Sequence, residues 1–133
     1  MVCHWPGIYF NGREVGFNIF KEVVRRLDER YDNLIWMKNS EISRYWAAKE
    51  LTRIDKREGH LAFNAPFATP DFTLAVSARP DGVPKLVSAG VPCPLKEVSS
   101  TLALKHGTWT RTGEQVVVCF DLPKGTSQLD ISQ

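Results

Sequence analysis

The segment EQVVVCFDL, residues 114–122, carries the clearest strand pattern in the chain. Its apolar residues Val116, Val118, Phe120 and Leu122 alternate with the other side chains, which is the period of a strand with one buried face. Cys119 falls on the opposite face, where a thiol packs as a small hydrophobic group. The segment therefore predicts a β-strand.

The same period of two runs through the residues that follow Gly59. Most of the eight prolines also lie there, which excludes long helices and divides the chain into short strands. Two hairpins are predicted: Phe72–Ser77 with Lys85–Ala89, and Thr108–Arg111 with Glu114–Leu122. Residues 59–133 are therefore predicted to form a β-rich accessory domain, either an antiparallel sheet or a small β-sandwich.

The residues before Gly59 follow a helical period instead. Between Glu14 and Tyr31 the apolar residues recur at spacings of 3, 4, 3 and 4, which places them on one face of an amphipathic helix. These residues are Phe17, Phe20, Val24, Leu27 and Tyr31. The apolar run Leu34–Met37 predicts a strand buried on both faces, and Ser40–Lys56 predicts a second helix.

With Met1–Cys3 as a further strand, the order is strand, helix, strand, helix, which favours parallel strands joined by crossover helices. Residues 1–58 are therefore predicted to form an αβ segment ahead of the β-rich domain. The predicted fold class of the chain is α+β.

Composition excludes several classes of protein. The chain has 133 residues, of which 43% are hydrophobic, and this is enough to bury a core. A net charge of +2 is too small to indicate a nucleic acid or an anionic membrane as partner. The apolar runs are shorter than the ~20 residues that a membrane helix needs. The three cysteines include no C-x-x-C pair, so neither a disulfide framework nor a thiolate metal site is indicated, and a cytoplasmic location is predicted.

Two segments resemble the polysaccharide deacetylase (NodB-type) family. The segment NLIWMKNSEISRYWA, residues 33–47, resembles the closing segment of that family, where a hydrophobic strand with a tryptophan leads into a helix. The segment HWPGIYFNGRE, residues 4–14, is similar to the late histidine loop that precedes it. The resemblance covers roughly residues 1–57. It implies that this part is the remnant of a distorted (β/α) barrel, in which earlier strands lie beside Met1–Cys3.

The family's chemistry is implied at one position only. Its enzymes are metal hydrolases that use an Asp-Asp pair and an H-x-x-x-H motif, and this sequence contains neither. His4 matches the late histidine, which acts as general acid toward the leaving amine, a role that suits a pKa near neutrality. No metal site and no cofactor are therefore predicted. Trp5, Tyr9 and Phe10 are candidates for a sugar-stacking platform, with cover of a core edge as the alternative.

These observations favour a non-catalytic C-terminal module of a polysaccharide deacetylase-like protein, with a structural or carbohydrate-associated role. Two alternatives stay open: a free-standing carbohydrate-binding module, and a part of a metal-dependent carbohydrate deacetylase that another chain completes, to which His4 would contribute.

The predicted strands Met1–Cys3 and Leu34–Met37 need neighbouring strands to pair with, because unpaired strand edges with apolar faces associate readily. The expected partners are a second copy of the chain or a missing N-terminal portion of the barrel. The remaining possibility is that the two halves pack over an interface containing Trp36.

Overall fold

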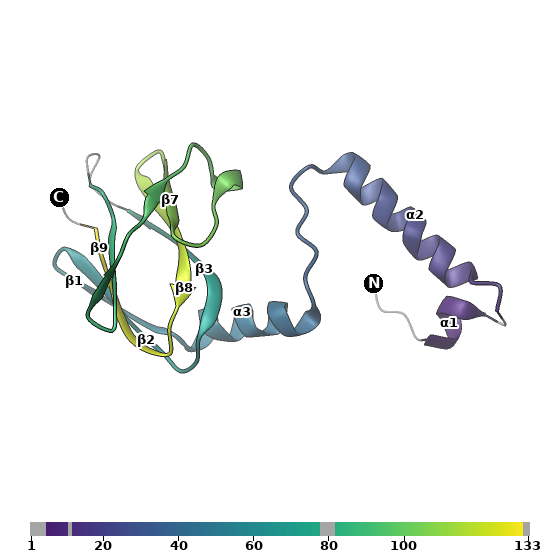
Figure 1. Ribbon diagram of the computed structural model, residues 1–133, viewed down its shortest axis with the longest axis horizontal. Helices are drawn as coiled ribbons and strands as arrows, with labels where there is room; N and C mark the ends of the chain where they lie inside the picture. Colours follow the sequence, from purple (N-terminus) through teal and green to yellow (C-terminus); the bar gives the residue numbers. More distant parts are fainter. Residues whose placement is uncertain (1–4, 11, 78–81, 132–133) are drawn as a thin grey trace. The chain divides into compact units, whose positions relative to one another are not determined.

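The computed structural model describes residues 5–10, 12–77 and 82–131, and the chain divides into two compact units (Figure 1). The first unit is residues 1–36 and the second is residues 37–133. The sequence predicts a division at Gly59 instead, and Gly59 lies in the two-residue turn between the paired residues Arg57 and His60 of the second unit.

The first unit contains two helices, α1 (Trp5–Tyr9) and α2 (Val15–Arg30). The amphipathic helix predicted between Glu14 and Tyr31 is therefore confirmed. The two helices approach closely at glycines, since a Cβ atom on Gly16 would lie 2.2 Å from the carbonyl oxygen of Gly7. Within the segment 4–14, which is similar to a histidine loop, Trp5–Tyr9 instead forms one helical turn that packs against α2.

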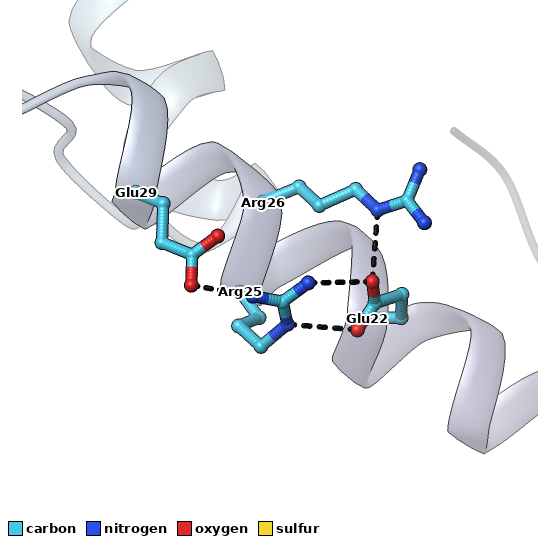
Figure 2. A network of polar contacts seen from close by, with 4 residues as sticks. All are labelled: Glu22, Arg25, Arg26 and Glu29. Atoms are coloured by element: carbon cyan, nitrogen blue, oxygen red, sulfur yellow. Dashed lines mark hydrogen bonds and ion pairs between the residues drawn. The ribbon is translucent and has the colours of Figure 1, made fainter.

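The polar side of α2 carries a network of ion pairs within the helix (Figure 2). Glu22 accepts hydrogen bonds from Arg25 at 2.7 and 2.8 Å and from Arg26 at 2.8 Å, and Arg25 also pairs with Glu29. The hydrogen bonds from Arg25, and then those from Arg26, lower the pKa of the Glu22 carboxyl to about 2. Pairs at these spacings stabilise a helix locally, so α2 has satisfied charges on this side.

The buried strand predicted at Leu34–Met37 is wrong. These residues are extended, but no described strand pairs with them, and the side chains of Ile35 and Trp36 are 82% and 58% exposed. The indole Nε1–H of Trp36 donates to Asp28 Oδ1 at 3.3 Å. An apolar run is buried as a strand only where neighbouring strands cover it, and the described residues supply none there. The strand predicted at Met1–Cys3 lies outside the described residues.

The second unit begins with helix α3 (Asn39–Leu51), which is shorter than the predicted helix Ser40–Lys56. The backbone N–H of Lys38 donates to Glu41 Oε2 at 2.7 Å at the start of the helix. At its other end, residues 53–57 form a strand, because pairing with the next strand places Ile54 opposite Phe63. Tertiary strand pairing thus overrides the helical spacing of these five residues.

After α3, the described residues of the second unit form nine strands and one short 3₁₀ turn, joined by loops. They are β1 (Arg53–Arg57), β2 (His60–Ala65), β3 (Thr69–Ser77), β4 (Lys85–Ser88), β5 (Val91–Cys93), β6 (Lys96–Glu97), η1 (Thr101–Ala103), β7 (Thr108–Thr112), β8 (Gln115–Leu122) and β9 (Gly125–Asp130). One sheet has the order β1-β2-β9-β4-β5 and the other has the order β3-β8-β7-β6. All pairs are antiparallel except β6 with β7.

The α+β class and the β-rich character after Gly59 are confirmed, and no helix longer than one turn occurs in the described residues between Leu61 and Leu122. The hairpin of β7 and β8 is also confirmed, with Thr112 opposite Gln115. The other predicted hairpin is wrong, because β3 pairs with β8 and β4 pairs with β9 and β5. Pairing with β8 places the buried ring of Phe72 opposite that of Phe120, which a hairpin with β4 would not do. Residues 78–81 of the predicted turn lie outside the described part.

The core lies between the two sheets, which face each other (Figure 1). Phe120 is fully buried at its centre and makes edge-to-face contacts with Phe63 of the other sheet at 5.7 Å and with Phe72 at 5.9 Å between ring centroids. Helix α3 joins this core through the buried side chain of Ala48 and through Tyr45, whose ring lies 6.2 Å from that of Phe72. The helix is therefore anchored to the sandwich along one side.

None of the helices in the described residues has both the length and the apolar character to cross a bilayer.

Candidate functional site

The residues predicted to form a site from the sequence fall at the start of the chain. His4 lies outside the described residues, and so does the side chain of Trp5. Tyr9 ends α1 and its ring stacks on Phe17 of α2, with 6.5 Å between the ring centroids and 14° between the planes. Phe10 follows with a positive φ of 31° and an exposed side chain. Of the proposed platform, the structure therefore describes one ring stacked on α2 and one ring open to solvent.

A second group of polar side chains lies on the outer face of the β3–β8–β7 sheet, and we name it the bulge cluster: Asp71, Thr73, His106, Cys119 and Asp121. The cluster is built around an irregularity in β3, where the register against β8 shifts between Thr69 and Phe72. Asp71 lies in this bulge with a φ of 52°, a left-handed conformation that is strained for a residue with a Cβ atom. The Asp71 N–H donates to Asp121 Oδ1 at 3.1 Å, so Asp121 holds the bulge in place.

His106 and Asp121 are joined by two alternative contacts. The Nδ1 atom of His106 lies 3.3 Å from the backbone nitrogen of Asp121 and 3.1 Å from its carboxylate oxygen Oδ1. One ring nitrogen cannot accept and donate at the same time. A neutral imidazole with its lone pair on Nδ1 accepts from the backbone N–H, whereas an imidazole with a proton on Nδ1 donates to the carboxylate. Both side chains are exposed, so bulk water competes for these contacts.

Cys119 lies next to these groups but is buried. Burial raises the pKa of its thiol, and the charges of Asp71 and Asp121 act in the same direction, while a hydrogen bond with Thr73 acts against them. The Sγ atom lies 4.0 Å from Asp71 Oδ1. A reactive cysteine needs a lowered pKa and access to solvent, and Cys119 has neither. Its predicted role as a packed thiol on this face agrees with its burial.

The bulge cluster thus offers an exposed imidazole and two carboxylates, without an activated nucleophile beside them. Among the residues that the structure describes, no group of three or more histidine, cysteine or acidic side chains is arranged to hold a metal ion. The groups present can exchange hydrogen bonds with a polar ligand such as a sugar hydroxyl.

Of this cluster, only Cys119 has a role predicted from the sequence, that of a packed thiol, and His106 lies just before β7. One sequence feature does point to the bulge: Pro70 falls inside an otherwise regular strand pattern, and proline within a sheet occurs at edges and bulges. The approach of His106 and Asp121, which are 15 residues apart, depends on the pairing of β7 with β8.

A third feature is the outward side of α3. Tyr45 and Ala48 face the sandwich, whereas Ile42 and Trp46, one turn apart, are exposed, Trp46 by 66%. An indole with this much exposure on an anchored helix presents a flat apolar surface to solvent. Trp and Tyr rings of this kind are enriched at binding interfaces.

Comparison of the chain with models of protein families, with curated proteins and with solved structures finds no match.

Proposed function

We propose that the chain is a non-catalytic module of a polysaccharide deacetylase-like protein, with a structural or carbohydrate-associated role. In this proposal residues 1–57, which resemble the end of the family's barrel, are a remnant of it, and α3 and β1 at the end of this segment have become part of the β-sandwich, the accessory domain. The apolar run Leu34–Met37 supports the first part, because it is extended and pairs with no described strand, as a strand separated from its sheet would be.

The observation that carries the carbohydrate-associated role is the exposed indole of Trp46. Trp46 lies within the segment that resembles the closing helix of the family, and α3 is fixed to the sandwich by Tyr45 and Ala48, so the ring is held on a rigid support. A sugar ring has an apolar face of C–H groups that can stack on such an indole. The proposed ligand is a polysaccharide with N-acetylated sugar units, the class on which the resembled family acts.

The proposed absence of catalysis is supported by the state of the bulge cluster. Its thiol is buried with a raised pKa, and the contacts of His106 run to Asp121 and not to a nucleophile. A nucleophile and its base need to lie within hydrogen-bond reach of each other.

Affinity gel electrophoresis with soluble chitin derivatives tests the carbohydrate role. We expect the full chain to be retarded with a dissociation constant on the order of 1 mM, typical of a weak contact through one ring. Trp46→Ala should lose this retardation, and Trp36→Ala, which removes another exposed indole, is the matched control that should keep it. If the unaltered chain migrates at the same rate with and without the polysaccharide, the carbohydrate-associated role is wrong and the structural role alone is left.

A further inference from the structure

Helix α2 carries an apolar stripe that the first unit leaves uncovered. The stripe consists of Phe17, Phe20, Val24, Leu27 and Tyr31, and none of the 16 residues of α2 is buried. Three of the stripe residues, Phe17, Phe20 and Tyr31, are exposed, and the other two are half-buried. The 3, 4, 3, 4 spacing corresponds to the a and d positions of a heptad, the narrow seam by which one helix packs on another. The geometry of the stripe therefore fits a helix as its partner.

Charged residues off the stripe and the start of α2 have partners within the first unit. Glu22, Arg25, Arg26 and Glu29 pair with one another (Figure 2), and the heptad places them in the b, c and f positions, away from the stripe. Helix α1 approaches at Gly16, and Tyr9 stacks on Phe17 at the first stripe residue. The part of the stripe from Phe20 onward is what a partner helix would cover.

The charges beside the stripe indicate which helix fits. Lys21 and Asp28 are seven residues apart, in the e positions along one margin of the stripe. The Nζ atom of Lys21 lies 4.9 Å from the centroid of the Phe17 ring, and Asp28 accepts the indole N–H of Trp36 from beside the helix. The other margin has Gly16, Val23 and Arg30 in the g positions. One margin thus carries a cation followed by an anion.

This arrangement is complementary to itself in one orientation. In an antiparallel pair of identical helices the e margins face each other, so Lys21 of each copy lies opposite Asp28 of the other. In a parallel pair the e margin faces the g margin, and Lys21 and Asp28 would meet Gly16 and Val23 and stay unpaired. An isologous two-fold pairing needs this kind of self-complementary surface.

We propose that the chain forms an antiparallel homodimer through the α2 stripe. Val24 of each copy packs against Leu27 of the other near the two-fold axis, and Phe20 packs against Tyr31 in the outer layers. Lys21 of each copy pairs with Asp28 of the other, so that two ion pairs flank the central layers. This inference does not rest on the proposed function.

Sedimentation equilibrium of the full chain tests the dimer. The interface is short, so we expect a dissociation constant of about 10–100 µM, in the range of small interfaces. Phe20→Glu should abolish dimerisation, because it places a charge in the seam. Ile19→Glu is the matched control: the neighbouring exposed apolar residue on the same helix lies off the stripe, and its variant should dimerise as the unaltered chain does. Far-UV circular dichroism should show that both variants keep their helices.

Charge reversal tests the orientation. Lys21→Glu and Asp28→Lys should each weaken the dimer by about tenfold or more, because each places like charges opposite one another twice. The double variant should return the dissociation constant to within about threefold of the original value, since the pairs are restored with opposite sign. A chain that stays monomeric up to about 500 µM overturns the proposal. So does a dimer that Phe20→Glu leaves intact, or a double variant as weak as the single ones.

Discussion

Replacing Phe120 with alanine should remove a large part of the stability of the second unit. Its ring is fully buried and makes edge-to-face contacts with one ring in each sheet, Phe63 at 5.7 Å and Phe72 at 5.9 Å. Removal of a buried phenylalanine side chain costs about 3–5 kcal/mol, which includes the loss of both aromatic pairs. Because a domain of this size is stable by about 5–15 kcal/mol, Phe120→Ala should be folded but easily denatured.

Urea denaturation measures this loss. The buried indole of Trp109 reports on the second unit through its fluorescence, and the midpoint should fall by roughly 2–3 M at an unchanged slope. Phe10→Ala is the control, because that ring is exposed and its loss should change the free energy of unfolding by less than about 0.5 kcal/mol. A loss below about 1 kcal/mol in Phe120→Ala would refute the reasoning, since the two sheets would then not be held together through this ring.

Three further predictions concern other parts of the chain. Gly16→Ala should detach α1 from α2, because the new Cβ would lie 2.2 Å from the Gly7 carbonyl oxygen. Gly7→Ala is the control and should keep α1 docked, because its Cβ would meet no atom within 4 Å. Amide exchange in α1 should therefore be faster in Gly16→Ala alone. Cys119 is buried and the pKa of its thiol is raised, so it should react with a thiol reagent far more slowly than the half-buried Cys93 until urea unfolds the second unit. Peptide mapping by mass spectrometry separates the two sites. Equal reaction rates in the native protein would contradict the burial of Cys119. The Glu22 carboxyl should titrate with a pKa of about 2, well below the ordinary 4.5. The stability that the ionised carboxylate gives α2 is therefore present above the ordinary pKa and is lost as the pH falls through the lowered pKa. ¹³C NMR of the Glu22 side chain measures this pKa, and a value near 4.5, or a lowered pKa that high salt does not raise, would count against the ion network.

Patterns within a short segment of the sequence correctly predicted the elements whose own residues show a regular strand or helix period. The alternation in β8 and the spacing in α2 are of this kind, and both elements occur where expected. The pairing of β3 depends on residues far from it in the sequence. The turn-like sequence after Ser77 favoured a hairpin with β4, but β3 pairs with β8 and the chain crosses to the other sheet, where β4 pairs with β9. The apolar character of Leu34–Met37 predicted a buried strand, and this prediction is wrong, because no described strand covers the run and its side chains are exposed.

The candidate site was less predictable than the fold. His106, Asp121 and Asp71 come from three separate parts of the sequence, and they meet because β7 and β3 flank β8. No spacing rule along the chain brings such residues together. Trp46 is exposed although it follows Tyr45 directly, because a helix against the end of a sandwich buries only the side that holds Tyr45 and Ala48.

The position of β9 has a consequence for the order in which the protein can fold during synthesis. Residues 125–130 are the last strand along the described chain, yet they lie in the middle of their sheet and join β2 on one side to β4 on the other. Before these residues emerge from the ribosome, the hairpin β1–β2 and the hairpin β4–β5 lack the strand that pairs with both of them. We therefore expect the apolar inner faces of both hairpins to stay exposed to solvent while the chain is being synthesised. Chaperone binding to the nascent chain should end abruptly once residue 130 leaves the exit tunnel.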